Sequence, residues 1–184
     1  LTARSLVEYG YEVIELPVTT DGVVDLATAK ALITEDTLLV AVQYANNETG
    51  VIQPIQQLTE LAHRQGALMH CGAVQGLGKA TLNISELEVD SASFSAHKIH
   101  GPKGVGALYL NHGVCHWPFA LPLQGGGQEK QVRPGTLNVP GIVGFGVAAD
   151  LIYQNLPERL KYMRHLCDIL EESLYDNFLG CIIH

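Results

Sequence analysis

Residues 38 to 72 read LLVAVQYANNETGVIQPIQQLTELAHRQGALMHCG and contain a predicted strand, a helix and a second strand. The run 38–44 is mostly apolar, which is typical of a strand covered on both faces. Pro54 opens a helix with apolar residues at helical spacing, and Gly66 ends it. Residues 67–71 then form another short buried strand. A strand, a helix and a strand in this order favour a parallel α/β arrangement.

The segments on either side extend this pattern. The β-branched and aromatic run 11–18 predicts a strand, residues 20–22 a turn, and residues 25–33 a short helix capped by Asp25. Two more strands are expected at 91–95 and 105–110. We therefore expect an α/β fold with a mixed, mostly parallel sheet flanked by helices, in which strand direction changes near the end.

The chain from Pro140 onward is predicted to be helical. Its apolar spine consists of Leu151, Ile152, Leu156, Leu160, Met163, Leu166, Leu170 and Leu174.

The composition excludes several classes of protein. The chain carries 11 basic and 19 acidic residues, a formal charge of -8, which argues against nucleic acid or acidic lipid as a partner. No run approaches the roughly 20 apolar residues of a membrane span. The four cysteines form no C-x-x-C pair, so we expect reduced thiols in a cytoplasmic protein without a metal site.

Polar or glycine-rich loops follow three of the predicted strands. They are 45–50 (ANNETG), 70–75 (HCGAVQ) and 95–98 (SAHK). Ligands of open α/β sheets bind at the carboxyl ends of the strands, so these loops predict one shared site. In the third loop, Lys98 has the amine needed to condense with an aldehyde cofactor, and Ser95 and His97 are suitable phosphate donors. A lone Lys98 would be interpreted as a surface lysine, but its neighbours favour the site.

These motifs resemble the cysteine desulfurases and selenocysteine lyases of the class V aminotransferase group. The matching strings are NNETG at 46–50, HCGAVQ at 70–75 with Gly78-Lys79, SFSAHKIHGPKG at 93–104, GGGQE at 125–129 and RPGT at 133–136. The order agrees from about Leu1 to about Asp150. The resemblance implies a fold type I PLP-dependent transferase, with 1–150 as the PLP-binding large domain and 151–184 as a helical connection to a small domain.

The resemblance also implies roles for individual residues. Lys98 matches the lysine that holds pyridoxal 5'-phosphate (PLP) as a Schiff base and moves the substrate Cα proton. Ser95 and His97 match phosphate ligands. Thr136 matches a residue that reaches the phosphate bound by the partner subunit, which implies a homodimer. Asn47 and Gln75, which taken alone would be a turn residue and a surface residue, match groups beside the cofactor's phenolic oxygen.

Gly72 departs from the family pattern. The family has an aspartate at this position, and its carboxylate pairs with the protonated pyridine nitrogen of the cofactor. Glycine cannot do this, and an unpaired buried charge costs about 3 to 5 kcal/mol, so the nitrogen is expected to lose its proton. Gly72 therefore predicts an impaired site, with weak cofactor binding and slow carbanion chemistry.

The family reaction converts L-cysteine to L-alanine and leaves persulfide sulfur on the enzyme. That sulfur can pass to an acceptor protein, for example in iron-sulfur cluster assembly. The chain opens at Leu1 in a helix-like run and ends on an apolar segment, so we expect a central fragment. The loop with the nucleophilic cysteine and the substrate-binding arginine are expected outside it, and the fragment alone is predicted to be inactive.

Other interpretations stay open. Selenocysteine is an alternative substrate, and a noncatalytic domain that serves as an interaction module is an alternative function. A metal site would draw on His97, His100, His112, Cys115 and His116, but the pair His112 and His116 lacks the acidic residue of a zincin motif. Residues 76–79 (GLGK) and 101–104 (GPKG) resemble phosphate loops, but the Walker pattern fails at Ala73 and Ala80.

Overall fold

The computed structural model describes residues 3–112, 125–178 and 180–181. In chain order the elements are the 3-10 helix η1 (Ala3–Tyr9), α1 (Leu26–Leu32), β1 (Leu39–Gln43), α2 (Ile55–Arg64), β2 (Leu68–Gly72), η2 (Ala73–Gln75), α3 (Ile84–Leu87), β3 (Ser91–Ser95), η3 (Ala96–Ile99), β4 (Gly106–Leu110), η4 (Glu129–Gln131) and α4 (Val139–Asn177).

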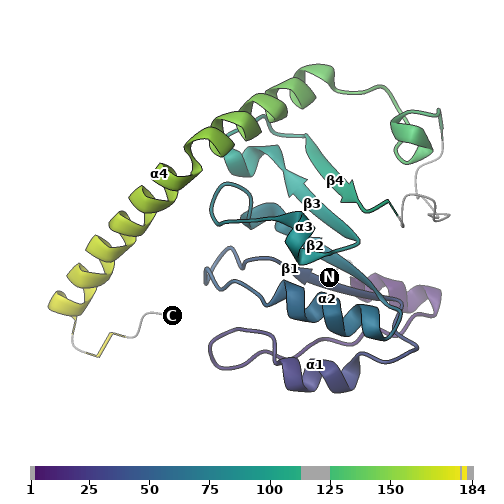
Figure 1. The fold of residues 1–184 in the computed structure, drawn as a ribbon, viewed down its shortest axis with the longest axis horizontal. Coiled ribbons are helices and arrows are strands. Elements are labelled where there is room, and N and C mark those ends of the chain that lie inside the picture. Colours follow the sequence, from purple (N-terminus) through teal and green to yellow (C-terminus); the bar gives the residue numbers. More distant parts are fainter. Residues whose placement is uncertain (1–2, 113–124, 179, 182–184) are drawn as a thin grey trace.

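The four strands form one sheet in the order β1-β2-β3-β4 (Figure 1). β1, β2 and β3 are parallel, and β4 runs antiparallel to β3. The register pairs Val42 with Cys71 and Cys71 with Ala92, so these side chains lie on one face. This confirms the predicted mixed, mostly parallel sheet and the change of direction at its last strand.

One face of the sheet forms the core with α2. Leu58 and Ala62 of α2 are fully buried, as are Met69 and Cys71 of β2. Asp90 links β2 to α2, because its carboxylate accepts hydrogen bonds from the Met69 backbone, at 2.7 Å, and from His63 of α2, at 2.8 Å. Residues of α1 and α3 join the same cluster. The sheet therefore has a packed layer on this face.

The opposite face of the sheet is less covered by the described residues. Leu39 is 52 % exposed and Leu108 is 55 % exposed, although both lie in strands. The prediction that residues 38–44 are covered on both faces is therefore wrong for the described part of the chain. Val40 is buried and its neighbours are not, because within the described ranges only the face toward α2 has a packing partner for β1.

Residues 11–18 do not form the predicted strand. The segment makes one isolated bridge, between Val18 and Val24, and the Asp25 backbone donates to the Pro17 carbonyl. Tyr11 and Ile14 are both more than half exposed. A strand needs a neighbour for its backbone groups, and no described strand lies beside this segment.

Helix α4 confirms the helical prediction for the end of the chain. It is 39 residues long, includes Pro157, and extends well beyond the sheet (Figure 1). Its first half packs on η3 through a cluster of Ile99, Ala148 and Ile152. Several residues of the predicted spine, including Leu151, are exposed. The boundary predicted at residue 150 falls inside this continuous helix and stays a prediction.

Candidate cofactor site

The three predicted loops lie at one edge of the sheet. β1, β2 and β3 are neighbours and parallel, so the loop 45–50, η2 and η3 all begin at their carboxyl ends. The Tyr44 backbone donates to the Gly72 carbonyl at 3.0 Å and holds the first two loops together. The fold thus brings Asn47, Gln75 and Lys98 to a common edge.

Asn47 lies in a turn built by its neighbour. The Asn46 Oδ1 atom accepts from the Glu48 and Thr49 backbones at 2.8 and 3.1 Å. Gly50 closes the turn with φ of +73°, a conformation that glycine adopts without strain. Because the Asn46 side chain makes the hydrogen bonds of the turn, the turn does not depend on the exposed Asn47 side chain.

Gly72 is the last residue of β2 and leads into η2. Its φ of -75° is one that any residue adopts. A Cβ added there would lie 3.4 Å from Gln43 Cα and 3.7 Å from Gln43 Cβ, which is ordinary contact. The backbone at this position can therefore carry a side chain, and steric crowding does not explain why residue 72 is a glycine.

Gln75, the last residue of η2, is held by Lys79. The Lys79 Nζ donates to Gln75 Oε1 at 2.5 Å. The pKa of Lys79 is lowered by its burial, then by the positive charges of Lys98 and Arg159. Lys79, Lys98 and Arg159 therefore form a local positive region in a chain of net negative charge.

His70 of β2 is held between two serines of β3. Its Nδ1 lies 2.8 Å from Ser91 Oγ, and its Nε2 lies 3.5 Å from Ser93 Oγ. Burial lowers the pKa of His70, so the imidazole is neutral at pH 7. This neutral ring lies on the less covered face of the sheet, two residues before Gly72.

The η3 turn carries the predicted phosphate and cofactor ligands. Ser95 Oγ lies 2.8 Å from His97 Nδ1, so the hydroxyl and the imidazole form one polar pair. His100 ends the turn with φ of +65°, and its backbone donates to the Ala96 carbonyl. The partly buried Lys98 amine makes no hydrogen bond or ion pair with any side chain among the described residues.

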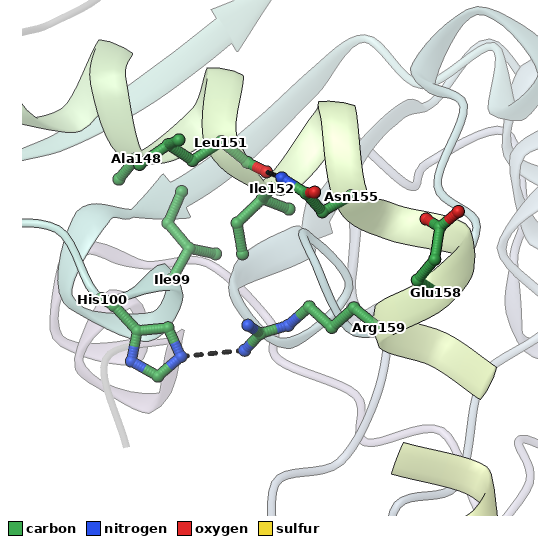
Figure 2. A pocket seen from close by; sticks show the side chains of 8 residues that line it. All are labelled: Ile99, His100, Ala148, Leu151, Ile152, Asn155, Glu158 and Arg159. Atoms are coloured by element: carbon green, nitrogen blue, oxygen red, sulfur yellow. Dashed lines mark hydrogen bonds between the residues drawn. The ribbon is translucent and has the colours of Figure 1, made fainter. Parts of the chain in front are cut away.

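Helix α4 packs against the η3 turn (Figure 2). Arg159 Nη2 lies 2.8 Å from His100 Nε2 across an open groove of about 520 Å³, which also contains Ile99 and Ile152. A guanidinium only donates, so His100 must accept at Nε2 and carry its proton on Nδ1. The Arg159 Nε is buried and finds no partner in the described part of the chain.

Thr136 is not brought to the other predicted residues. It is exposed, and Arg133 Nη1 lies 3.5 Å from its carbonyl oxygen. Figure 1 shows the η4 region beyond the carboxyl end of β4, whereas η3 leads into the other end of that strand. Thr136 is therefore not among the residues that gather at the carboxyl edge of β1, β2 and β3.

The donor set fits an anionic cofactor with an aldehyde group. Ser95 and His97 supply a hydroxyl and an imidazole for a phosphate, and Lys98 supplies an amine without a side-chain partner. The local positive region favours an anion further. One part does not fit: at Gly72 no carboxylate is available for a pyridinium nitrogen.

The profile of the family described as aminotransferase class V matches residues 1–178. The chain belongs to this family. Its members depend on PLP and share the mixed sheet flanked by helices. A cysteine desulfurase from Klebsiella pneumoniae is 47% identical over 165 residues, which are 90% of this chain and 41% of that protein. The cysteine desulfurase IscS of Rickettsia typhi is 40% identical over 172 residues, covering 94% of this chain and 42% of that protein.

Solved structures of NifS-like proteins have the same fold. One aligns with a TM-score of 0.89 and 43% identity, covering 95% of this chain and 48% of its own length. Another, from Rickettsia africae, aligns with a TM-score of 0.85 and 35% identity, covering 94% and 48%. The chain spans less than half the length of each of these relatives.

The described residues contain neither a metal-binding cluster nor a membrane-spanning helix. No group of three or more His, Cys, Asp or Glu residues there is arranged to hold a metal ion. Cys115 and His116 of the metal hypothesis lie outside the described residues. No described helix is both long and apolar enough to cross a membrane.

Proposed function

We propose that this chain forms the cofactor-binding core of a PLP-dependent cysteine desulfurase, with Lys98 as its cofactor-binding lysine. The observation that carries the proposal is the Lys98 amine, which has no side-chain partner among the described residues and directly follows the Ser95–His97 pair. An ordinary surface lysine does not need this setting at the carboxyl edge of a parallel sheet.

The residues of η3 and its N-cap, Ser95, have different roles in cofactor binding. Ser95 would donate its hydroxyl and His97 its imidazole Nε2–H to the phosphate, in place of the hydrogen bond that Ser95 Oγ and His97 Nδ1 make with each other here, and the backbone turn keeps both beside Lys98. Lys98 would hold the cofactor through its side-chain amine, and the same amine, when free, would accept the proton from the substrate Cα. The bound cofactor supplies the electron sink that this deprotonation requires.

Asn47 and Gln75 complete the cradle from the neighbouring loops. Their amide N–H groups are suited to the phenolic oxygen of the cofactor, where a donor stabilises the negative charge. Thr136 is proposed to reach the phosphate bound by the partner subunit. The neighbouring η4 lies beyond the end of β4 and away from η3, which supports this assignment and the homodimer that it requires.

Gly72 is proposed to impair the site. Without a carboxylate at this position, the pyridine nitrogen stays uncharged and withdraws electrons less strongly. The cofactor would be held mainly by Lys98 and the phosphate ligands. This is also the observation that favours the second candidate function, a noncatalytic domain that keeps the fold as an interaction module.

The substrate is proposed to be L-cysteine, with selenocysteine as the alternative, and the product sulfur to pass to an acceptor protein. The relatives named above as cysteine desulfurases support this choice. We propose the cytoplasm as the location. A relative from Encephalitozoon cuniculi, 39% identical over 183 residues and covering 42% of that protein, is named as mitosomal, so related enzymes also operate in organelles.

A cofactor titration tests the proposal. The chain is titrated with PLP and monitored by visible absorbance, beside Lys98→Ala and the matched control Lys30→Ala, which removes an exposed lysine of α1. We expect saturable binding by the natural chain and the control, and a loss of the covalent absorbance band in Lys98→Ala. Equal spectra for Lys98→Ala and the natural chain would contradict the assignment. No binding by any variant would favour the interaction module.

A further inference from the structure

The GLGK segment at 76–79 forms a turn that is fixed at two glycines. A Cβ at Gly76 would lie 2.7 Å from the Tyr44 ring, and a Cβ at Gly78 would lie 2.8 Å from Ile152 of α4. Gly78 also has φ of +74°. A side chain at either place would have to displace Tyr44 or Ile152, and the Lys79 backbone donates to the Gly76 carbonyl at 3.2 Å. The turn therefore brings the Lys79 side chain back to Gln75, the residue just before the turn.

The contact between Lys79 and Gln75 selects one orientation of the amide. An ammonium group only donates, so it must face the Gln75 carbonyl oxygen Oε1. The Gln75 Nε2 then points elsewhere, and it has no hydrogen-bond partner among the residues that the structure describes. A flipped amide would place two N–H donors against a cation, which is repulsive. The lysine thus leaves an N–H donor available at the carboxyl edge of the sheet.

We propose that Lys79 is a positioning residue that fixes the Gln75 amide with its N–H group toward the cofactor's phenolic oxygen. The inference rests on the proposed function and deepens it, because it explains how a freely rotating amide presents a donor and not an acceptor. It also gives the GLGK segment a role that does not involve nucleotide binding. Lys79 itself touches neither the cofactor nor the substrate in this scheme.

The surroundings of Lys79 support this role. Lys98 and Arg159 are near enough for their positive charges to lower the pKa of Lys79, and no carboxylate among the described residues forms an ion pair with it. The Gln75 oxygen is thus the acceptor that the turn provides. Arg159 also fixes His100 at the end of η3, so α4 holds both η3 and the GLGK turn in place.

The experiment measures PLP affinity by absorbance titration in the natural chain and in the Gly72→Asp chain. Lys79→Ala should weaken affinity about tenfold, the effect of losing a charge-assisted hydrogen bond, whereas Lys79→Arg should retain it. In a Gln75→Leu background, Lys79→Ala should cause no further loss. Lys30→Ala is the control for removal of one positive charge.

A cofactor analogue separates positioning from general charge. Pyridoxal phosphate lacking the 3-hydroxyl has no phenolic oxygen, so the natural chain and Lys79→Ala should bind it equally. An equal loss of affinity for both ligands, or an equal loss with and without Gln75, would overturn the inference and leave cofactor binding by Lys98 intact. Failure of the natural and Gly72→Asp chains to bind PLP would instead remove the proposed function on which the inference rests.

A measurement without cofactor tests the contact directly. In the ligand-free chain, the side-chain amide resonances of Gln75 should shift in Lys79→Ala and stay near their natural positions in Lys79→Arg and Lys30→Ala. Unchanged Gln75 resonances in Lys79→Ala would overturn the inference, because the lysine would then not hold the amide.

Discussion

Gly72 is the residue that separates this chain from its family pattern, and the structure leaves room for the missing group. We predict that Gly72→Asp folds normally and binds PLP about 10- to 100-fold more tightly, since a hydrogen bond to a charged partner contributes about 1.5 to 3 kcal/mol. The added Cβ meets Gln43 at 3.4 Å and needs no backbone change. A PLP titration of both chains gives the ratio of affinities.

The matched control is Gly72→Asn, which fits the same space without the charge. Equal affinities for Gly72→Asp and the natural chain would show that Gly72 is not the defect.

Cys71 illustrates a residue that burial makes inert. Burial raises the pKa of this fully buried thiol to about 11, so at pH 8 about one molecule in a thousand carries the thiolate. We predict that iodoacetamide at pH 8 modifies the exposed Cys167 at least about tenfold faster than Cys71, and that unfolding in urea removes the difference. Peptide mass spectrometry reads both rates. Similar rates in the folded chain would contradict the burial of Cys71.

The sequence predicted which residues gather at the site better than it predicted their contacts. Spacing after strands placed Asn47, Gln75 and Lys98 at one edge, because parallel strands end together. It gave no sign of the pairing of His70 with Ser91, since periodicity indicates a face and not a partner across strands. Lys79, which hydrogen-bonds to Gln75, follows it by four residues in the GLGK segment. The sequence did not reveal this contact, because the glycines of that segment suggested a phosphate loop.

At the scale of elements, the cap of α1 predicts a dependence on pH. The Thr28 hydroxyl, the Thr28 backbone and the Ala27 backbone donate to Asp25, and these bonds lower the pKa of the carboxyl from its usual 3.8. A lowered folded-state pKa stabilises the fold above pH 3.8 and loses this effect as the pH falls through the folded value.

We therefore expect Asp25→Ala to lower the melting temperature at pH 7 more than at pH 2.5. Asp25→Asn, which keeps an acceptor but not the charge, should lower it less than Asp25→Ala at each pH, and its effect should also shrink from pH 7 to pH 2.5. Thermal unfolding followed by circular dichroism measures the three chains. A destabilisation by Asp25→Ala that is the same at pH 7 and pH 2.5 would refute the charged cap.

Element prediction succeeded where a residue run had a neighbour and failed where it had none. The strand at 91–95 was predicted to the residue, because it lies between β2 and β4. The run 11–18 contains more β-branched and aromatic residues than 91–95 but has no described partner strand, so it stays mostly unpaired. Propensity describes the segment alone, whereas a strand is a property of a pair.

At the scale of the whole molecule, the position of Thr136 predicts a shared site. Mixed dimers of Lys98→Ala chains and Thr136→Ala chains should contain one complete site, made from the intact Lys98 of one subunit and the intact Thr136 of its partner. We expect such dimers, separated by different affinity tags, to bind one PLP per dimer with natural affinity. If Thr136 acts within its own subunit, the mixed dimer has no complete site, and its affinity will match that of the Thr136→Ala homodimer.

The central claim concerns a covalent link to one lysine, and borohydride reduction tests it most directly. The chain is incubated with PLP, reduced, digested and analysed by mass spectrometry, with Lys98→Ala as the control. We predict that the reduced cofactor lies on the peptide containing Lys98, and that the control carries none. Labelling spread over Lys79, Lys103 and other lysines, or the same labelling in Lys98→Ala, would contradict the account.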